Sequence, residues 1–248
     1  MRAQTTKGIK TDSPAGGNAL FGSRSLGTVN TLTERVYQAM KKHIVNGVLH
    51  AGAAVTEKDL ATMYNSSRTP VREAALRLQQ ENLLRIVPNR GYFVSSLTIQ
   101  EVNDMYEYRA AVEGACAELV ATRGIPQAML VELSRLARTK CQTKTRSGYA
   151  KFIDADTAFH VAIARLTHNE LMIRAVANMR CQTDRILFAA ADAIEMGYYG
   201  ELPVREHCAI LEAIRRGDSQ AARKLMYDHI LGAKQRILQL ARGGFRLP

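Results

Sequence analysis

The stretch that decides the fold of this chain is residues 65–78, which read Asn65-Ser66-Ser67-Arg68-Thr69-Pro70-Val71-Arg72-Glu73-Ala74-Ala75-Leu76-Arg77-Leu78. The first residues are typical of a tight polar turn. Pro70 suits the first turn of a helix, where its missing N–H costs nothing. Ser67 or Thr69 is expected to cap the exposed N–H groups of that helix. The stretch therefore predicts a turn followed by a helix over about 69–81.

This predicted helix has two different faces. Its apolar stripe consists of residues at positions i, i+4 and i+7, namely Val71, Ala75 and Leu78. Arg68 and Arg72 are one turn apart and lie off that stripe. A helix that buries one side and projects hydroxyls and guanidiniums from its N-terminal end suits the major groove of DNA. The residues predicted to read DNA there are Ser67, Arg68, Thr69 and Arg72.

The surrounding sequence predicts a winged helix-turn-helix. Helices are expected over about 31–46 and 56–64, and two β-prone runs at 83–87 and 91–95 flank the strong turn signal Pro88-Asn89-Arg90-Gly91. Lys58, at the start of the second helix, is expected to meet a backbone phosphate. Arg90 and Gly91, at the hairpin tip, are expected to reach an adjacent groove or phosphate.

Everything after Thr98 reads as helical, over about 98–123, 127–144, 148–167, 169–195, 203–216 and 218–242. The expected fold class is therefore mainly α, with a winged helix-turn-helix followed by an all-α bundle. The expected domains are a disordered tail at 1–28, a DNA-binding domain at 29–96 and an all-α metal- and effector-binding domain at 98–242.

Charge and composition limit the class of protein. The chain has 248 residues, a formal net charge of +11 and 46% apolar residues. Residues 1–96 hold 13 Lys and Arg against 6 Asp and Glu, which favours a polyanionic partner such as nucleic acid. The sequence contains no apolar run of about 18 residues, so we expect no membrane span. The four cysteines show no CxxC spacing, so we expect reduced thiols and a cytoplasmic protein.

Four polar residues lie on apolar stripes in the helical part. Asp156 and His160 are one turn apart, His207 precedes an apolar stripe, and His229 lies among apolar residues. A carboxylate on such a stripe is costly unless it is paired or bound to a metal, and one carboxylate with three imidazoles suits a divalent transition metal. Taken singly, each histidine also fits a satisfied core residue, and Asp156 with His160 also fits a surface ion pair.

The N-terminal motifs resemble a known family. Its DNA-binding domain is matched over residues 32–96 by segments that include Glu57-Lys58-Asp59-Leu60-Ala61, Ser67-Arg68-Thr69-Pro70-Val71-Arg72-Glu73-Ala74 and Pro88-Asn89-Arg90-Gly91-Tyr92-Phe93-Val94. These closely resemble the GntR family of bacterial transcription regulators. Three positions depart from the family pattern: Asn82 replaces a usual Gly, Asn65-Ser66 replaces Gly-Val, and Ala75 replaces Leu. None of them is a polar residue expected to read DNA.

The helical part, over roughly 98–240, resembles the FCD effector domain of the FadR-type branch. The resemblance rests on Tyr108-Arg109…Glu113, Asp156-x-x-Phe159-His160, Glu206-His207, Gly217-Asp218 and Met226-x-x-His229-Ile230. Six helices resemble the VanR-like subgroup. The resemblance implies that Asp156, His160, His207 and His229 bind a metal such as Zn, Ni or Mn. It also implies that Arg109 binds a small carboxylate effector, although an ion pair between Arg109 and Glu113 fits its spacing nearly as well.

These expectations together predict a dimeric transcription regulator, not an enzyme. It would be a repressor of a metabolic operon that binds a palindromic operator as a homodimer and responds to a small organic acid held at the metal site. Two alternatives stay open at this stage. One is a metal-dependent enzyme that uses the Asp/His pocket, and the other is a DNA-binding protein without an effector.

Overall fold

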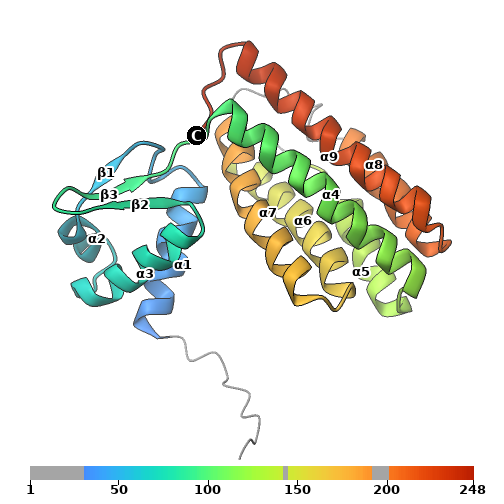
Figure 1. Cartoon of the computed structure of the whole chain (residues 1–248), viewed down its shortest axis with the longest axis horizontal. Coiled ribbons are helices and arrows are strands. Elements are labelled where there is room, and N and C mark those ends of the chain that lie inside the picture. Colours follow the sequence, from blue (N-terminus) through green and yellow to red (C-terminus); the bar gives the residue numbers. More distant parts are fainter. Residues whose placement is uncertain (1–30, 142–144, 192–200) are drawn as a thin grey trace, which may run out of the picture. The chain divides into compact units, whose positions relative to one another are not determined.

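Three helices and a small antiparallel sheet form the N-terminal domain (Figure 1). The computed structural model describes residues 31–141, 145–191 and 201–248, so the tail predicted at 1–28 lies outside the described residues. The elements of this domain are α1 Leu32–Val45, β1 Ala54–Val55, α2 Glu57–Met63, α3 Arg68–Gln80, β2 Leu84–Val87 and β3 Gly91–Val94. The predicted winged helix-turn-helix is confirmed.

The sheet has one strand more than the sequence predicts. Its order is β1-β3-β2 and both pairings are antiparallel. Leu84 lies opposite Val94, as expected for the hairpin, and Ala54 of the additional strand lies opposite Phe93. Two residues are too few to show the alternation that marks a strand in a sequence, so β1 was not predicted.

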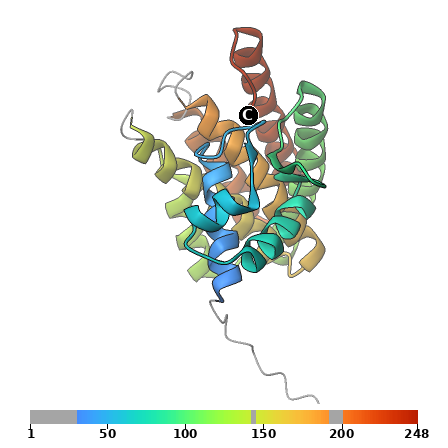
Figure 2. The same ribbon diagram turned by 90° about the vertical axis from the view of Figure 1, so that its left-hand side faces the viewer.

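The N-terminal core lies between α1 and α3, which pack against each other (Figure 2). Met40 of α1 and Leu60 of α2 are fully buried in it. The stripe predicted on the third helix also faces this core, because Val71, Ala75 and Leu78 have no exposed surface. Burial of that stripe leaves the opposite, polar face of α3 to solvent.

The turns of this domain are built on asparagines with positive φ. Asn65 (φ 46°) lies between α2 and α3, Asn82 (φ 58°) follows α3, and Asn89 (φ 61°) lies in the hairpin turn. Asparagine tolerates the left-handed region better than other residues with a side chain. Two of these asparagines are the positions at which the chain departs from the family's usual glycine, so the substitution preserves the backbone conformation.

The predicted side-chain cap on α3 is wrong. Ser67 is the N-cap residue and has an extended backbone (φ −77°, ψ 170°), but no side-chain hydrogen bond caps the helix. The preceding helix α2 does have a full capping box, because Thr56 Oγ1 accepts from Asp59 N and the Asp59 carboxylate accepts from Thr56 N. The capping box of α2 is thus formed by Thr56 and Asp59 and does not use the side chain of Glu57, the first residue of the helix.

The second domain is the predicted all-α bundle. Within the described residues its helices are α4 Ile99–Arg123, α5 Gln127–Ala137, α6 Arg146–Leu166, α7 Glu170–Ala190, α8 Glu201–Arg215 and α9 Ser219–Arg242. Polar side chains cap several starts, among them Thr98, Asn169 and Asp218. The helix predicted at 127–144 is too long, since α5 ends at Ala137 and the Thr139 hydroxyl then donates to the carbonyl of Arg135.

The long helices α4 and α9 run side by side through this bundle (Figure 1). Gly114 of α4 permits their close approach, because a Cβ atom built there would lie 3.3 Å from the backbone oxygen of Arg223 in α9. Fully buried residues such as Tyr106 and Phe159 fill the core around these helices. No helix among the described residues is both long enough and apolar enough to cross a membrane.

The hairpin turn generates a stability prediction. Gly91 has φ +93°, and a Cβ atom there would lie 2.8 Å from the backbone oxygen of Val55 in β1. We expect Gly91→Ala to lower the free energy of unfolding by about 1–3 kcal/mol, because the left-handed backbone and the clash both oppose it. Gly52→Ala is the matched control, since Gly52 also has positive φ but nothing within 4 Å of its Cβ position. Equal losses for the two variants in urea denaturation would contradict the clash.

Candidate nucleic-acid interface and metal centre

The residues predicted to read DNA lie at the exposed N-terminal end of α3. Ser67, Arg68 and Thr69 are exposed, and the side chains of Arg68 and Arg72 are 65% and 64% exposed. Both arginines approach one carboxylate that the sequence analysis did not select, that of Glu57. Arg72 Nε donates to Glu57 Oε2 at 2.6 Å, and Arg68 Nε lies 3.8 Å from Glu57 Oε1. The exposed face of α3 therefore has a defined arrangement before any ligand is present.

The remaining predicted DNA contacts lie beside this face. Lys58 is exposed at the start of α2, and Arg90 is exposed in the hairpin turn. Gly91 is half-buried, and its role in the structure is to bring β3 next to β1. A groove of about 370 Å³ separates α3 from the hairpin, and its lining includes Glu57, Arg72, Leu76, Tyr92 and the turn residues Pro88, Asn89 and Gly91. A single surface thus carries the helix end and the wing.

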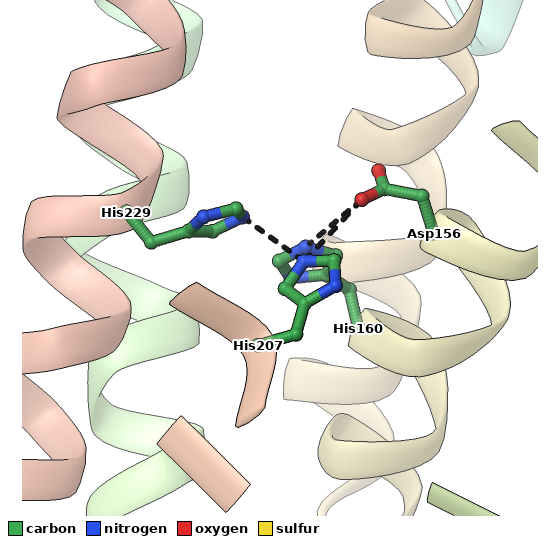
Figure 3. Close-up of side chains that lie close together, drawn as sticks. All are labelled: Asp156, His160, His207 and His229. Carbon is green, nitrogen blue, oxygen red and sulfur yellow. Dashed lines mark hydrogen bonds and ion pairs between the residues drawn. The ribbon is translucent and has the colours of Figure 1, made fainter. Parts of the chain in front are cut away.

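The four predicted metal ligands converge in the second domain (Figure 3). Asp156 and His160 come from α6, His207 from α8 and His229 from α9. All four are buried, and one ligand atom from each lies within 4.8 Å of the others. Residues separated by more than seventy positions in the sequence thus form one cluster, with the carboxylate and the imidazoles pointing toward one another.

The spacing of these atoms fits a transition metal. His207 Nε2 lies 3.3 Å from both Asp156 Oδ1 and His229 Nε2, and His160 Nε2 lies 4.0 Å from Asp156 Oδ1. Two ligands about 2.1 Å from a tetrahedral ion lie roughly 3.4 Å apart. His160 Nε2 is fully buried and has no hydrogen-bond partner among the described residues. Such an orphaned nitrogen, aimed at a carboxylate and two imidazoles, is what a metal site requires.

The outer nitrogens of two histidines face carboxylates. His160 Nδ1 lies 2.5 Å from Glu113 Oε2, and His229 Nδ1 lies 2.7 Å from Glu206 Oε2. A carboxylate on Nδ1 fixes the ring orientation and directs Nε2 inward, which is the usual arrangement behind a metal-binding histidine. Asp156 is held in a similar way, because Arg180 Nη2 donates to its Oδ2 and leaves Oδ1 facing the imidazoles.

Burial and the neighbouring charges set the protonation states. Although burial alone raises the pKa of Asp156, the Arg180 guanidinium holds it well below its usual range. Burial likewise opposes ionisation of Glu113, but Arg109 keeps its pKa low. Burial lowers the pKa of His160 to about 4 and that of His207 well below its ordinary value. Asp156 is therefore ionised and the imidazoles of His160 and His207 are neutral, which are the forms that bind metals.

A small cavity of about 50 Å³ adjoins the cluster, and Asp156 and His229 contribute to its wall. Arg109 also lines it. Its Nε donates to Glu113 Oε1 at 2.7 Å and its Nη1 to Thr183 Oγ1 at 3.0 Å. Arg109 therefore forms the ion pair with Glu113 that its spacing allows and also lines the cavity, so the ion pair does not exclude the predicted role in effector binding. Within the described part of the chain, neither Arg109 Nη2 nor Tyr106 Oη has a hydrogen-bond partner.

Comparison with protein families agrees with both halves of this description. Residues 32–94 match the model described as bacterial regulatory proteins, gntR family, and residues 104–232 match the FCD domain. The chain belongs to the GntR family. It is a transcriptional regulator of that family with an FCD domain, and its relatives are transcription regulators rather than enzymes. The alternative of a metal-dependent enzyme is therefore not pursued.

Curated relatives of this GntR-family regulator match most of its length. The HTH-type transcriptional repressor RspR of Escherichia coli K12 is 24% identical over 215 residues, which cover 87% of this chain and 92% of RspR. The Uxu operon regulator of Haemophilus influenzae is 25% identical and covers 86% of this chain and 84% of its own length. Among solved structures, E. coli McbR/YncC has a TM-score of 0.69 at 22% identity, covering 84% of this chain and 98% of that one. The structural similarity shows the shared fold.

The residues that the sequence analysis missed are the charged partners of those it selected. Glu57, Glu206 and Arg180 were not selected, and Glu113 was considered only as a partner for Arg109. Glu206 could have been noticed because it adjoins His207, yet its carboxylate contacts His229 instead. Only the packing of α8 against α9 identifies that contact.

The buried network of this GntR-family regulator generates a second stability prediction. Glu113→Ala should lower the free energy of unfolding by about 3–5 kcal/mol, because it leaves the Arg109 guanidinium buried without its carboxylate. Glu118→Ala is the control on the same helix, since Glu118 pairs with Arg223 at the surface and should cost less than about 1 kcal/mol. Urea denaturation with a chelator present separates the two. A small loss for Glu113→Ala would mean that Arg109 finds water or another partner.

Proposed function

We propose that this GntR-family regulator binds a palindromic operator as a homodimer and represses a metabolic operon until a small organic acid binds to its metal-containing FCD domain. The observation that carries the proposal is the buried Asp156/His160/His207/His229 cluster beside a cavity with unpartnered donors. We further propose that the protein is cytoplasmic.

Operator binding is assigned to the exposed end of α3 and the wing. Hydroxyls at Ser67 and Thr69 and the guanidiniums of Arg68 and Arg72 suit base edges and nearby phosphates, with arginine bidentate on guanine. Lys58 and Arg90 suit the phosphate backbone on either side. In a two-fold symmetric dimer this surface occurs twice, so the preferred operator has two equivalent half-sites.

The metal assignment rests on chemistry rather than on spacing alone. Asp156, His160, His207 and His229 would hold a divalent ion, and Zn, Ni and Mn all accept a mixture of imidazole and carboxylate ligands. A divalent ion bound by four protein ligands can also accept an oxygen atom from a small acid, which is the chemistry that it supplies. Glu113 and Glu206 would keep His160 and His229 directed toward it.

The effector is proposed to be a small carboxylate in the cavity beside the cluster. Arg109 and Tyr106 both line this cavity, and among the described residues the buried atoms Arg109 Nη2 and Tyr106 Oη have no hydrogen-bond partner. Buried donors without acceptors are unfavourable, and an anionic ligand with several oxygens would satisfy both. Binding would change operator affinity through a coupling free energy of about 1–3 kcal/mol.

Repression is inferred from the name of one relative, the transcriptional repressor RspR, and control of an operon from that of another, the Uxu operon regulator. One experiment tests the whole proposal. Native mass spectrometry of the purified protein identifies bound metal and ligand, and operator binding is then measured with and without a panel of organic acids. Absence of any effect from every acid, with metal bound, would instead favour a DNA-binding protein without an effector.

The DNA assignment generates a third prediction. Arg68→Ala and Arg72→Ala should each weaken binding to a selected operator by about 1–3 kcal/mol and relax sequence preference. Lys58→Ala and Arg90→Ala should weaken binding to all sequences and lower the salt slope by about one. Arg135→Ala, an exposed arginine of α5, is the control for loss of charge. Unchanged operator affinity at matched salt for both α3 variants would show that another surface reads the DNA.

The fourth prediction concerns stabilisation of the protein by metal ions. Added Zn²⁺, Ni²⁺ or Mn²⁺ should raise the melting temperature of the chelator-treated parent, because only the folded state presents the four ligands together. His207→Ala and His229→Ala should lose this metal-dependent shift, along with the effector response, and retain residual DNA binding. His50→Ala, an exposed loop histidine, should behave like the parent. Equal shifts in the parent and in both variants would place the metal elsewhere.

A further inference from the structure

We propose that Glu57 is a positioning residue for base reading: its carboxylate holds the Arg72 guanidinium by Nε, so that the Nη1 and Nη2 groups face the bases. The proposal rests on the assignment of Arg72 to the major groove made above. It adds a residue on α2 that contacts no base and yet determines how α3 discriminates between sequences.

The contact is asymmetric in a way that matters for recognition. Arginine recognises guanine through two parallel N–H groups that meet O6 and N7. Glu57 accepts from Nε of Arg72 at 2.6 Å. Among the described residues no hydrogen-bond partner is recorded for Arg72 Nη1 or Nη2. The Nη1 and Nη2 groups, which suit guanine, are therefore available to a base, while the contact of Nε with Glu57 restrains the side chain.

Restraint has value here because the Arg72 side chain is 64% exposed. A long, exposed side chain samples many rotamers, and ordering it on binding costs conformational entropy. A carboxylate that orders it beforehand removes part of that cost. It also restricts the guanidinium to one location, which penalises a base pair that offers no acceptors there.

Glu57 itself is held by groups from two other elements, the wing strand β3 and the recognition helix α3. Tyr92 Oη of β3 donates to Oε2 at 3.3 Å, Arg72 of α3 donates to the same oxygen, and Arg68 Nε lies 3.8 Å from Oε1. Hydrogen bonding from Arg72 keeps the pKa of Glu57 below its ordinary value, so the carboxylate is ionised at neutral pH. The carboxylate thus connects the recognition helix to the wing, on the wall of the groove between them.

Two other roles for Glu57 predict different behaviour. If it competed with DNA for Arg72, its removal would strengthen operator binding. If it read a base directly, by accepting from cytosine N4, it would act whether or not Arg72 were present. A negative charge at the interface also opposes binding to any phosphate backbone, so the three roles differ in how specific and non-specific binding change.

The experiment measures the affinity of the full-length protein for three kinds of duplex at one salt concentration. The first is a selected operator, the second is the same duplex with each half-site guanine replaced in turn by 7-deazaguanine, which lacks the N7 acceptor, and the third is unrelated DNA. The parent and Arg72→Ala identify the guanine that Arg72 reads. Glu57→Gln should then lower the discrimination at that guanine by about tenfold, while affinity for unrelated DNA stays level or rises.

The controls separate positioning from folding and from charge. Glu73→Gln removes the same charge from α3, where Glu73 accepts from Thr33 of α1 at 2.7 Å, and should leave discrimination unchanged. In an Arg72→Ala background, Glu57→Gln should have no further effect on discrimination, because the two residues act as a unit. A loss of folding would instead lower specific and non-specific affinity together and would appear in the melting temperature.

Each contrary outcome overturns a different statement. Tighter operator binding by Glu57→Gln with discrimination retained would make Glu57 a competitor. Loss of discrimination by Glu57→Gln in the Arg72→Ala background would make it a direct reader. Intact discrimination in Glu57→Gln, beside a loss in Arg72→Ala, would overturn the positioning role alone. Intact discrimination in Arg72→Ala would overturn the assignment of Arg72, and this proposal with it.

Discussion

The helical domain is organised around an ionised carboxylate in its interior, that of Asp156. A buried charge is tolerated only when it is paired and hydrogen-bonded, and Arg180 meets this requirement from α7. Arg180 is itself buried and also contacts Asp184 and Thr157. Glu113 and Arg109 form a second buried pair behind His160. These pairs extend from α4 through α6 to α7, so charged side chains join three packed helices. Replacing any one of them by an apolar residue would leave its partner as a buried, unpaired charge.

Charged pairs of this kind contribute little net stability when complete, and their removal is severe when only one partner is lost. Their value to this domain lies in direction. Together with Glu206, which contacts His229 Nδ1, they leave Oδ1 of Asp156 and Nε2 of His160 and His229 pointing at a common centre. The domain therefore holds polar ligand atoms at positions that apolar side chains usually fill in a core. Such an arrangement suits the binding of a further group, such as a metal ion.

How much the sequence predicts depends on how local the signal is. The stripe Val71, Ala75 and Leu78 identifies the buried face of α3 because helical period alone decides it. The four cluster residues could be selected because each is polar among apolar neighbours, and one carboxylate with three imidazoles suits a metal. The family resemblance then favoured a shared site over four separate core residues. Glu113 and Glu206 serve histidines on other helices, so no spacing in the sequence shows their partners. The strand β1 could not be predicted either, because two residues show no alternation and only pairing with β3 defines them as a strand.

Helices α4 and α9 approach closely at a position where α4 carries no side chain. Gly114 directly follows Glu113 on α4 and faces the backbone of α9, the helix that supplies His229. Any side chain at position 114 would require α9 to move away by a few tenths of an ångström. The two walls of the site would then separate, and no adjustment of rotamers could restore their spacing, since the obstacle is main chain. The separation of the two helices that flank the cluster therefore depends in part on a backbone contact that only glycine at position 114 permits.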